Sequence, residues 1–394
     1  MRNFIINLFL LSICLLPIKV KGSTLSIEDT LRKVKLLFVG DIMGHEPQIK
    51  SAEVQKNTSY NYKPCFQYLA PIIQQADIAI GNLEVTLPGK PPYRGYPIFR
   101  SPNDLAKGLK WAGFDVLMTS NNHSNDSRAK GLIRTIETLK NLGFHQTGTF
   151  KNSRERALFY PLIINKNGIK LAFLNYTYDT NGIRTIPPTI VNGIYLNTIQ
   201  KDIAKAKKLK ADAIIVMMHW GDEYQLIENQ RQRYLANWLV ERGVDLVIGA
   251  HPHVVQPIIE KTIKTPHQKP RKVLIAYSLG NFVSNQNKKN TDGGIILEIE
   301  LTKNTKQDQT VISNSDFIPV WRYIQQTAKK EVYRVLPIAA FELGNRQLLN
   351  MSKEDKIAMK DFARTTRARL RHKGATERFV KLETVSKRKK IALK

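Results

Sequence analysis

The sequence predicts an α/β fold, in which buried strands alternate with helices that cross between them. Three observations predict it: short apolar runs of strand length, segments of helical periodicity between them, and polar residues directly after the apolar runs. The chain has 394 residues, which is long enough for one large domain with appended segments. A hydrophobic fraction of 42% is ordinary for a globular protein and excludes a chain that is disordered throughout.

Five apolar runs are expected to form buried strands, each of which delivers polar residues at its C-terminal end. The runs are Val34–Val39, Ile78–Ile80, Val116–Thr119, Ile214–Met218 and Leu246–Ile248. The residues that follow them include Asp41, Glu84, Asn122, His123, His219, His251 and His253. In α/β sheets, functional groups gather beyond the carboxyl ends of the strands, so we expect all five segments at one edge.

Four segments between these runs have apolar residues three and four positions apart, which is typical of amphipathic helices. They are 104–111, 130–142, 198–209 and 230–242. Two later apolar runs, Val273–Tyr277 and Ile295–Leu301, are expected to close a second sheet. In the latter run Glu298 and Glu300 alternate with apolar residues, which predicts a half-exposed strand.

The chain is unusually basic. It has 61 Lys and Arg against 33 Asp and Glu, a net charge of +28, which favours polyanionic partners such as nucleic acid, anionic lipid or an acidic polymer without choosing among them. From Ser352 onward there are fifteen Lys or Arg against five Asp or Glu. We expect a main domain over residues 33–325 and a basic C-terminal extension over residues 326–394, helical in part.

The N-terminus has the layout of a secretory signal: Arg2, the apolar run Phe4–Leu16, and small residues near Ser23. We therefore expect residues 1–22 to be a signal peptide and the protein to be exported, to the periplasm, the medium or the cell envelope. An uncleaved membrane anchor is the alternative, because a proline and two lysines disturb the cleavage region. Cys65 would be the one mature cysteine, so no intrachain disulfide is expected.

The polar residues after the strands are of the types that bind divalent metal ions, since carboxylate oxygens and neutral imidazoles converge in such sites. The predicted ligands are Asp41, Glu84, Asn122, His219, His251 and His253. These six residues are enough to bind one or two divalent ions of Mn, Zn, Fe or Mg. A pair of ions can stabilise both the attacking and the leaving oxygen of a displacement reaction. Each histidine alone is more often a packed or surface residue, but their shared position after strands favours a site.

His123 is the predicted general acid, and Asp126, three residues later, is predicted to orient its ring through a hydrogen bond. Capping of the loop by Asp126 is an equal alternative. Trp220, Glu223 and Asn281 are predicted substrate contacts, although Glu223 could simply face solvent.

Four further histidines are not assigned to the site. His45 follows Asp41 by four residues and is expected only to line its loop. His145, His267 and His372 lack the strand-to-turn setting and are excluded.

Six motifs, in this order, resemble those of the bacterial poly-gamma-glutamate capsule synthesis (CapA) family. They are GDIM (40–43), GNLE (81–84), NNHSND (121–126), HWGDEY (219–224), GAHPHVVQ (249–256) and SLGNF (278–282). The resemblance covers roughly residues 35–301 and implies the calcineurin-like metallophosphoesterase architecture, a four-layer αββα sandwich around a dinuclear site. In that superfamily the first motif is Asp-x-His, whereas Met43 stands here, and the second is Gly-Asp, whereas Asn82 stands here. Because a thioether is a soft, poor ligand for these ions, one metal position lacks a ligand.

The resemblance also implies a role in the synthesis or export of poly-gamma-glutamate or a related anionic envelope polymer, near a membrane-bound synthesis complex. The leading hypothesis is an exported metal-dependent hydrolase of phosphoester or amide bonds. The alternative is a noncatalytic, polyanion-binding envelope factor with a vestigial metal site. Contact with an anionic membrane surface stays open. Nucleic-acid binding ranks lowest, because the export signal argues against it and no stacking-aromatic motif is present.

Overall fold

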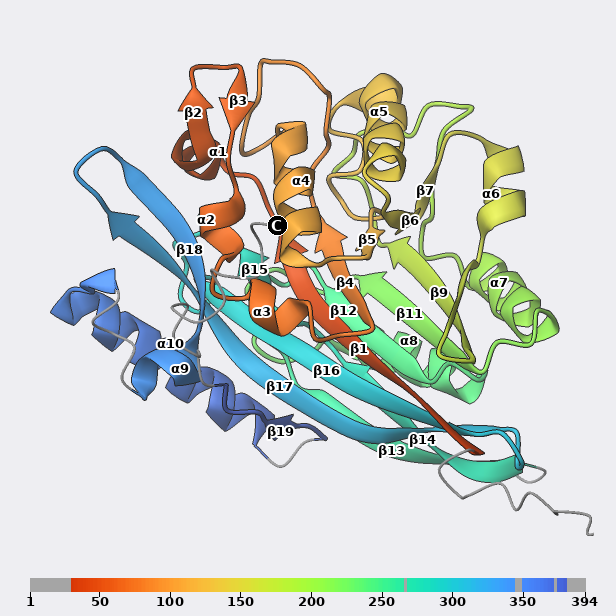
Figure 1. Ribbon diagram of the computed structural model, residues 1–394. Helices are drawn as coiled ribbons and strands as arrows, with labels where there is room; N and C mark the ends of the chain where they lie inside the picture. Colours follow the sequence, from red (N-terminus) through yellow and green to blue (C-terminus); the bar gives the residue numbers. More distant parts are fainter. Residues whose placement is uncertain (1–29, 266–267, 344–348, 372–373, 381–394) are drawn as a thin grey trace, which may run out of the picture.

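The computed structural model describes residues 30–265, 268–343, 349–371 and 374–380. Two β-sheets pack face to face, and helices lie on their outer sides (Figure 1). One apolar cluster joins the facing sides of the two sheets, and two further clusters join each sheet to its own helices. The four-layer αββα sandwich that the resemblance implied is therefore confirmed.

The first sheet has nine strands, ordered β18-β17-β16-β1-β4-β5-β6, with β15 beside β1 and β19 beside β17. Their bounds are β1 (Leu31–Ile42), β4 (Ile78–Leu83), β5 (Val116–Met118), β6 (His145–Thr147), β15 (Asn281–Val283), β16 (Gly293–Asn304), β17 (Gln309–Gln326), β18 (Glu331–Pro337) and β19 (Thr376–Glu377). Strands β1, β4, β5 and β6 are parallel, so their carboxyl ends meet at one edge.

The second sheet has six strands, ordered β13-β14-β12-β11-β9-β8. Their bounds are β8 (Leu162–Lys166), β9 (Ile169–Thr177), β11 (Ala213–His219), β12 (Leu246–Ala250), β13 (Ile258–Thr265) and β14 (Gln268–Ala276). Two short pairs stand apart: β2 (Glu53–Gln55) with β3 (Ser59–Tyr60), and β7 (Thr149–Phe150) with β10 (Ile190–Val191). Strands β9, β11, β12 and β14 are parallel, so this sheet too gathers carboxyl ends at one edge.

The helices cross between strands and cover the outer faces. They are α1 (Glu46–Ala52), α2 (Lys63–Phe66), α3 (Ala70–Ile73), α4 (Asn103–Ala112), α5 (Arg128–Asn141), α6 (Ser153–Phe159), α7 (Leu196–Lys208), α8 (Gln230–Glu241), α9 (Ile338–Glu342) and α10 (Lys353–Leu370). The four predicted helices are confirmed as α4, α5, α7 and α8. Local signals explain where two of these helices begin and end. The Asn229 side chain accepts a hydrogen bond from the Gln232 backbone N–H at the start of α8, and Gly113, at φ 108°, ends α4.

The predicted strands are confirmed, but their distribution between sheets was not foreseen. The expectation of one shared sheet edge is wrong, because β1, β4 and β5 belong to the nine-stranded sheet and β11 and β12 to the six-stranded one. The runs Val273–Tyr277 and Ile295–Leu301 do not close a sheet together either. The first lies in β14 of the smaller sheet and the second in β16 of the larger.

Strand β16 is covered on both faces, so the prediction of a half-exposed strand is wrong at Glu298. This side chain is 3% exposed and is held by two cations: its carboxylate lies 3.2 Å from Lys35 Nζ and 2.5 Å from Arg378 Nε. Arg378 follows β19, which pairs in parallel with β17. The C-terminal region therefore supplies the cation that allows this carboxylate to be buried.

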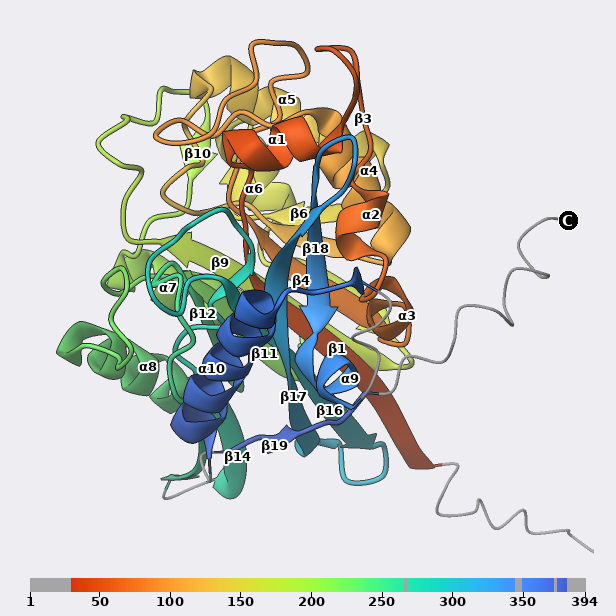
Figure 2. The same cartoon turned by 90° about the vertical axis from the view of Figure 1, so that its left-hand side faces the viewer.

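The described residues after 326 continue the fold. Strand β18 pairs with β17, and α10 confirms the helix expected after Ser352 (Figure 2). The boundary at 325/326 stays a prediction, as do the signal peptide at residues 1–22 and the basic run 387–390, which lie outside the described residues. Among those described, no helix combines the length and apolar character needed to cross a membrane. Cys65 is buried and not in a disulfide.

Candidate metal centre

The strand ends of the two sheets meet, and their polar residues form one buried cluster. Asp41 ends β1, Glu84 follows β4, His219 ends β11 and His251 follows β12. In register, Asp41 lies beside Asn82 in the first sheet and His219 beside Ala250 in the second. The sandwich therefore brings together ligands that are as far as 212 positions apart.

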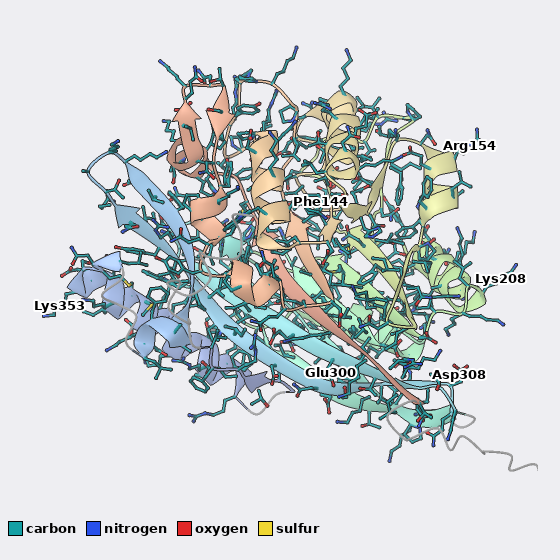
Figure 3. All side chains as sticks on the ribbon, viewed as in Figure 1. Phe144, Arg154, Lys208, Glu300, Asp308 and Lys353 are labelled. Atoms are coloured by element: carbon teal, nitrogen blue, oxygen red, sulfur yellow. The ribbon has the colours of Figure 1, made fainter. Side chains whose placement is uncertain are left out.

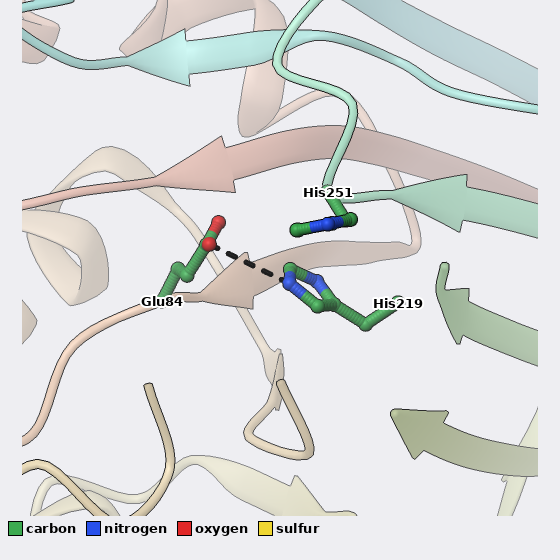
Figure 4. Close-up of side chains that lie close together, drawn as sticks. All are labelled: Glu84, His219 and His251. Carbon is green, nitrogen blue, oxygen red and sulfur yellow. Dashed lines mark ion pairs between the residues drawn. The ribbon is translucent and has the colours of Figure 1, made fainter. Parts of the chain in front are cut away.

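Glu84, His219 and His251 form the inner part of this cluster (Figure 4). All three are at most 3% exposed. The Glu84 carboxylate lies 3.5 Å from His219 Nε2, and the two imidazole rings have centroids 4.8 Å apart. Their ligand atoms lie within 4.8 Å of one another, a spacing that allows all three to reach one ion.

Two further groups overlap with the first: Asp41, Glu84 and His253, and Glu223, His251 and His253. Asp41 accepts a hydrogen bond of 2.8 Å from Asn82 Nδ2 and lies 3.0 Å from His253 Nδ1. Asn122 Oδ1 lies 2.9 Å from His219 Nε2. The structure thus brings all six predicted metal ligands into one cluster.

The charge state of the cluster fits a bound cation. Burial raises the pKa of Glu84 well above its usual value, and the neighbouring Asp41 raises it further. Neither oxygen of Glu84 has a hydrogen-bond partner among the described residues, and neither has His251 Nδ1. A buried carboxylate without donors is costly unless a cation meets it, so the residues present fit a divalent ion.

His219 and His251 are held in the neutral form that binds metals. Burial lowers the pKa of His219 well below its usual value, and it lowers the pKa of His251 to about 3, with His253 adding to both effects. Burial alone would raise the pKa of Asp41, but the hydrogen bonds from His253 and Asn82 outweigh it and lower that pKa. The cluster therefore combines a charged carboxylate with neutral imidazoles.

The turn that carries His251 and His253 is strained. Both residues have positive φ, 98° and 60°, which non-glycine residues rarely adopt. The His251 backbone N–H is directed at Asp41, 3.2 Å from Oδ2. Backbone strain of this kind persists where the surroundings fix it, and it is typical of functional sites.

Gly249 precedes this turn and has no room for a side chain. A Cβ atom there would lie 1.8 Å from the Tyr277 carbonyl oxygen and 2.6 Å from Trp220 Nε1. We expect Gly249→Ala to lower the free energy of unfolding by about 1–3 kcal/mol, as overpacking does, in urea titrations of the metal-free protein. Unchanged stability would show that the β12 backbone can move to admit a methyl group.

His123 and Asp126 lie beside the cluster and are 5% exposed. His123 Nδ1 is 2.8 Å from Asp126 Oδ2, which also accepts a hydrogen bond from the Phe99 backbone at 2.5 Å. The position of Asp126 therefore fits both roles expected from the sequence, because this carboxylate orients the His123 ring and also holds the loop through the Phe99 backbone. His45 begins α1, contacts Gln48 and packs edge-on against Phe99, as expected of a loop-lining residue.

The three predicted substrate contacts have different surroundings. Trp220 is 1% exposed and donates its indole N–H to the Tyr277 carbonyl at 2.9 Å, so its side chain packs in the core, and its role as a substrate contact stays a prediction. Glu223 reaches 3.9 Å from His253 Nε2 with its side chain 43% exposed. Asn281 is buried, with Oδ1 3.1 Å from His253 Nδ1, where it orients a ligand.

Two site residues escaped the sequence analysis. Tyr178 follows β9, and its ring covers His251 at 4.5 Å and His219 at 6.4 Å between centroids. Asn181 accepts a hydrogen bond from Asn122 Nδ2 at 3.3 Å. Both follow the apolar run of β9 (Ile169–Thr177) within four residues, but that run was not among the five strands predicted from the sequence. Of the histidines set aside, His145 is exposed in β6, and His267 and His372 lie outside the described residues.

Met43 and Asn82 take the places where the wider superfamily has ligands. Met43 is 2% exposed and packs in the cluster between the larger sheet and its helices. Asn82 donates to Asp41 and its Oδ1 accepts from Asn121, so its amide acts as a hydrogen-bonding support. The lack of one ligand stays a prediction, and both placements agree with it.

Comparisons with known proteins agree with the motifs. The family model described as "Bacterial capsule synthesis protein PGA_cap" matches residues 35–286. The capsule biosynthesis protein CapA of Bacillus anthracis is 30% identical over 283 residues, which cover 69% of this chain and 65% of that protein. The PGA biosynthesis protein CapA of Bacillus subtilis (strain 168) is 30% identical over 282 residues, covering 68% and 67%.

Solved structures match at lower similarity. The NAD nucleotidase NadN of Haemophilus influenzae has a TM-score of 0.47 and 10% identity, covering 89% of this chain and 58% of that one. The calcineurin-like phosphoesterase YfkN from Bacillus subtilis has a TM-score of 0.41 and 13% identity, covering 86% and 97%. The family model and the two capsule relatives show that the chain belongs to the bacterial capsule synthesis protein family.

Proposed function

We propose that this chain is an exported, metal-dependent hydrolase of phosphoester or amide bonds that acts in the synthesis or export of an anionic envelope polymer such as poly-gamma-glutamate. The observation that carries the proposal is the buried Glu84 carboxylate, which has no hydrogen-bond partner among the described residues and faces two neutral imidazoles. The polymer class is suggested by the relatives, whose names refer to capsule and PGA biosynthesis.

The residues of the cluster would share the work as follows. Asp41, Glu84, Asn122, His219, His251 and His253 would hold one or two divalent ions. When bound, such an ion supplies a Lewis acid that polarises the ester or amide oxygen. His123 is oriented through Nδ1 by Asp126, which leaves Nε2 to donate a proton to the leaving oxygen or nitrogen. Glu223 and Tyr178, at the exposed side, would contact the substrate.

Purified residues 23–394 should contain divalent metal by elemental analysis and should hydrolyse a chromogenic phosphodiester or a γ-glutamyl amide. Chelation should remove both the metal and the activity, and one of Mn, Zn, Fe or Mg should restore them. Protein that binds no metal after these additions and stays inactive would overturn the proposal. Such a result would favour the noncatalytic polyanion-binding factor, a role that the net charge of +28 also supports.

Replacing His123 by alanine should separate proton transfer from metal binding. General acid catalysis contributes about 10²–10⁴-fold, so we expect kcat to fall by that factor while the metal content stays at the wild-type level. Asp126→Asn should give a smaller loss of about 10–100-fold, because the ring stays but loses its charged partner. Full activity in His123→Ala would show that the proton comes from elsewhere.

A further inference from the structure

A second basic site adjoins the metal centre. The loop between β15 and β16, one edge of β17 and one side of α10 enclose an open cavity of about 370 Å³. Its polar lining includes Lys288, Lys289 and Asn290 of the loop, Arg322 of β17, and Arg364 and Thr365 of α10. The α10 wall lies beyond residue 286, where the match to the capsule family model ends.

The basic side chains of this cavity have few ion-pair or hydrogen-bond partners among the described residues. Lys288 and Lys289 are exposed, and neither forms an ion pair with any described residue. Arg322 is largely buried and donates to the Gln286 carbonyl at 3.0 Å, yet its Nε–H is buried and meets no acceptor in the described part of the chain. Arg322 also lines the cavity, so its guanidinium places a positive charge beside the open space, where it would attract an anionic oxygen ligand.

The acidic residues nearby do not neutralise this excess. Asp361 pairs with Arg364 on α10 at 3.3 Å, and Asp292 accepts a hydrogen bond from the Trp321 indole at 2.6 Å. Burial lowers the pKa of Arg322, and the Asp292 carboxylate offsets this only in part. Asp292 keeps its charge when it accepts from the neutral indole, so the lining carries four cations against two carboxylates, a net charge of +2, and the cavity has a positive potential.

Two chains of contacts connect the cavity to the metal centre. Lys288 Nζ lies 3.6 Å from the centroid of the Tyr224 ring, and that ring lies 6.1 Å from the ring of His253. On the other side, Asn281 contacts His253 through Oδ1 and donates from Nδ2 to Gln286 Oε1 at 2.9 Å. A substrate long enough to span these residues could occupy both places.

Helix α10 holds this arrangement in place. Thr365 Oγ1 contacts Asn290 at 3.0 Å, and Arg369 donates to the Val255 carbonyl at 2.8 Å. These two contacts tie α10 to the loop between β15 and β16 and to the segment that follows His253. The C-terminal helix is therefore built into the surroundings of the site.

We propose that this cavity is an anion-binding subsite for a polymeric substrate, which holds a carboxylate or phosphate group of the chain while a bond further along lies at the metal centre. The guanidinium of Arg322, whose Nη2 already donates to the Gln286 carbonyl, adds a fixed positive charge, and the two exposed lysines supply donors that either group accepts. The link to the metal centre rests on the function proposed above, whereas anion binding itself does not.

Binding can be measured without turnover. Fluorescence anisotropy with the full chain would use three labelled probes: an oligomer of γ-linked glutamate, an oligomer of glycerol phosphate and a neutral oligoglutamine. We expect the γ-glutamate oligomer to bind and oligoglutamine not to bind. The Lys288→Gln/Lys289→Gln variant should weaken binding about five- to tenfold, since each exposed pairing contributes up to about 1 kcal/mol.

A matched control removes the same charge elsewhere. Lys201 and Lys208 are exposed on α7, far from α10, as the positions of Lys208 and Lys353 show (Figure 3). Lys201→Gln/Lys208→Gln should change binding less than about twofold, because distant charges are screened by salt. Equal binding by wild type and the Lys288/Lys289 variant, or equal loss in both double variants, would overturn the subsite.

Further variants separate the subsite from the proposed chemistry. Arg322→Gln removes the charge from the cavity wall, and we expect about tenfold weaker binding in a protein whose folding is checked by thermal unfolding. In chelated, metal-free protein the oligomer should still bind, and Lys288→Gln/Lys289→Gln should still weaken that binding about five- to tenfold, because the subsite does not include the metal. Binding that survives in an inactive protein would support the subsite even if the hydrolase proposal failed.

Binding of the phosphate oligomer alone, weakened in the same variants, would support the site and assign it to a phosphate polymer.

Discussion

Replacement of His251 by alanine is expected to empty the metal centre and abolish hydrolysis. His251 belongs to two of the three overlapping ligand groups, so its loss leaves each of these with two members. Loss of an outer-shell partner costs about 10–100-fold in metal affinity, and loss of a direct ligand should cost more. Elemental analysis after dialysis should find metal in the wild type and little in the variant, and kcat/KM should fall by more than about 10³-fold.

His145→Ala is the matched control, because that histidine is exposed in β6 and takes no part in the cluster. It should keep wild-type metal content and activity. Metal retained at full stoichiometry in His251→Ala would contradict the assignment of this imidazole as a ligand. Loss of activity with metal retained would instead make it a substrate contact.

Glu84→Gln is expected to have opposite effects on metal binding and on the stability of the metal-free protein. The unfolded carboxyl has a pKa near 4.5, and burial raises the pKa in the metal-free folded protein. The folded state therefore holds the proton more tightly. The contribution of Glu84 to stability is fully present below pH 4.5 and is lost as the pH rises through the folded pKa.

The neutral amide of Glu84→Gln carries no charge to desolvate. At pH 8 and without metal we expect the variant to be more stable than wild type by about 1–3 kcal/mol, because a buried charge costs more to desolvate than a neutral amide in the same place. At pH 4 the difference should shrink. Added metal at 100 times its dissociation constant should stabilise wild type by about 2.7 kcal/mol and leave the variant unchanged.

Urea unfolding at pH 4 and at pH 8, each with chelator and with added metal, measures the free energy of unfolding of both proteins under all four conditions. Glu354→Gln, at an exposed position of α10, is the control and should follow wild type in each condition. A metal-free Glu84→Gln protein less stable than wild type at pH 8 would show that the carboxylate has a favourable partner in the folded state.

Much of the site was accessible from the sequence because it follows from local rules. A strand buried in a parallel sheet must be apolar throughout, so runs such as Ile214–Met218 are visible, and the first polar residue after them marks the sheet edge. The six predicted ligands were chosen in this way, and the structure brings their side chains together. Helix periodicity similarly predicted α4, α5, α7 and α8 within two residues at each end, whereas the short helices α1, α2, α3, α6 and α9 were not predicted.

The features that the sequence analysis missed depend on distant partners. Whether β11 pairs with β1 or stands in a facing sheet depends on long-range contacts that leave no mark within the strand itself. Trp220 follows a ligand directly, but the carbonyl of Tyr277, 57 positions away, directs its indole into the core. Glu298 looked like a solvent-facing residue because its neutralising partner, Arg378, lies 80 positions further along.

The division of the ligands between the two sheets makes a bound ion a cross-link. Asp41 and Glu84 belong to one sheet and His219 and His251 to the other, so an ion held by both would join layers that otherwise adhere through apolar packing. The sheets could then separate only after the ion leaves, which should slow proteolysis and amide exchange at both strand edges together. Metal supply would thus set how long each molecule lasts in a protease-containing compartment, independently of any reaction that it catalyses.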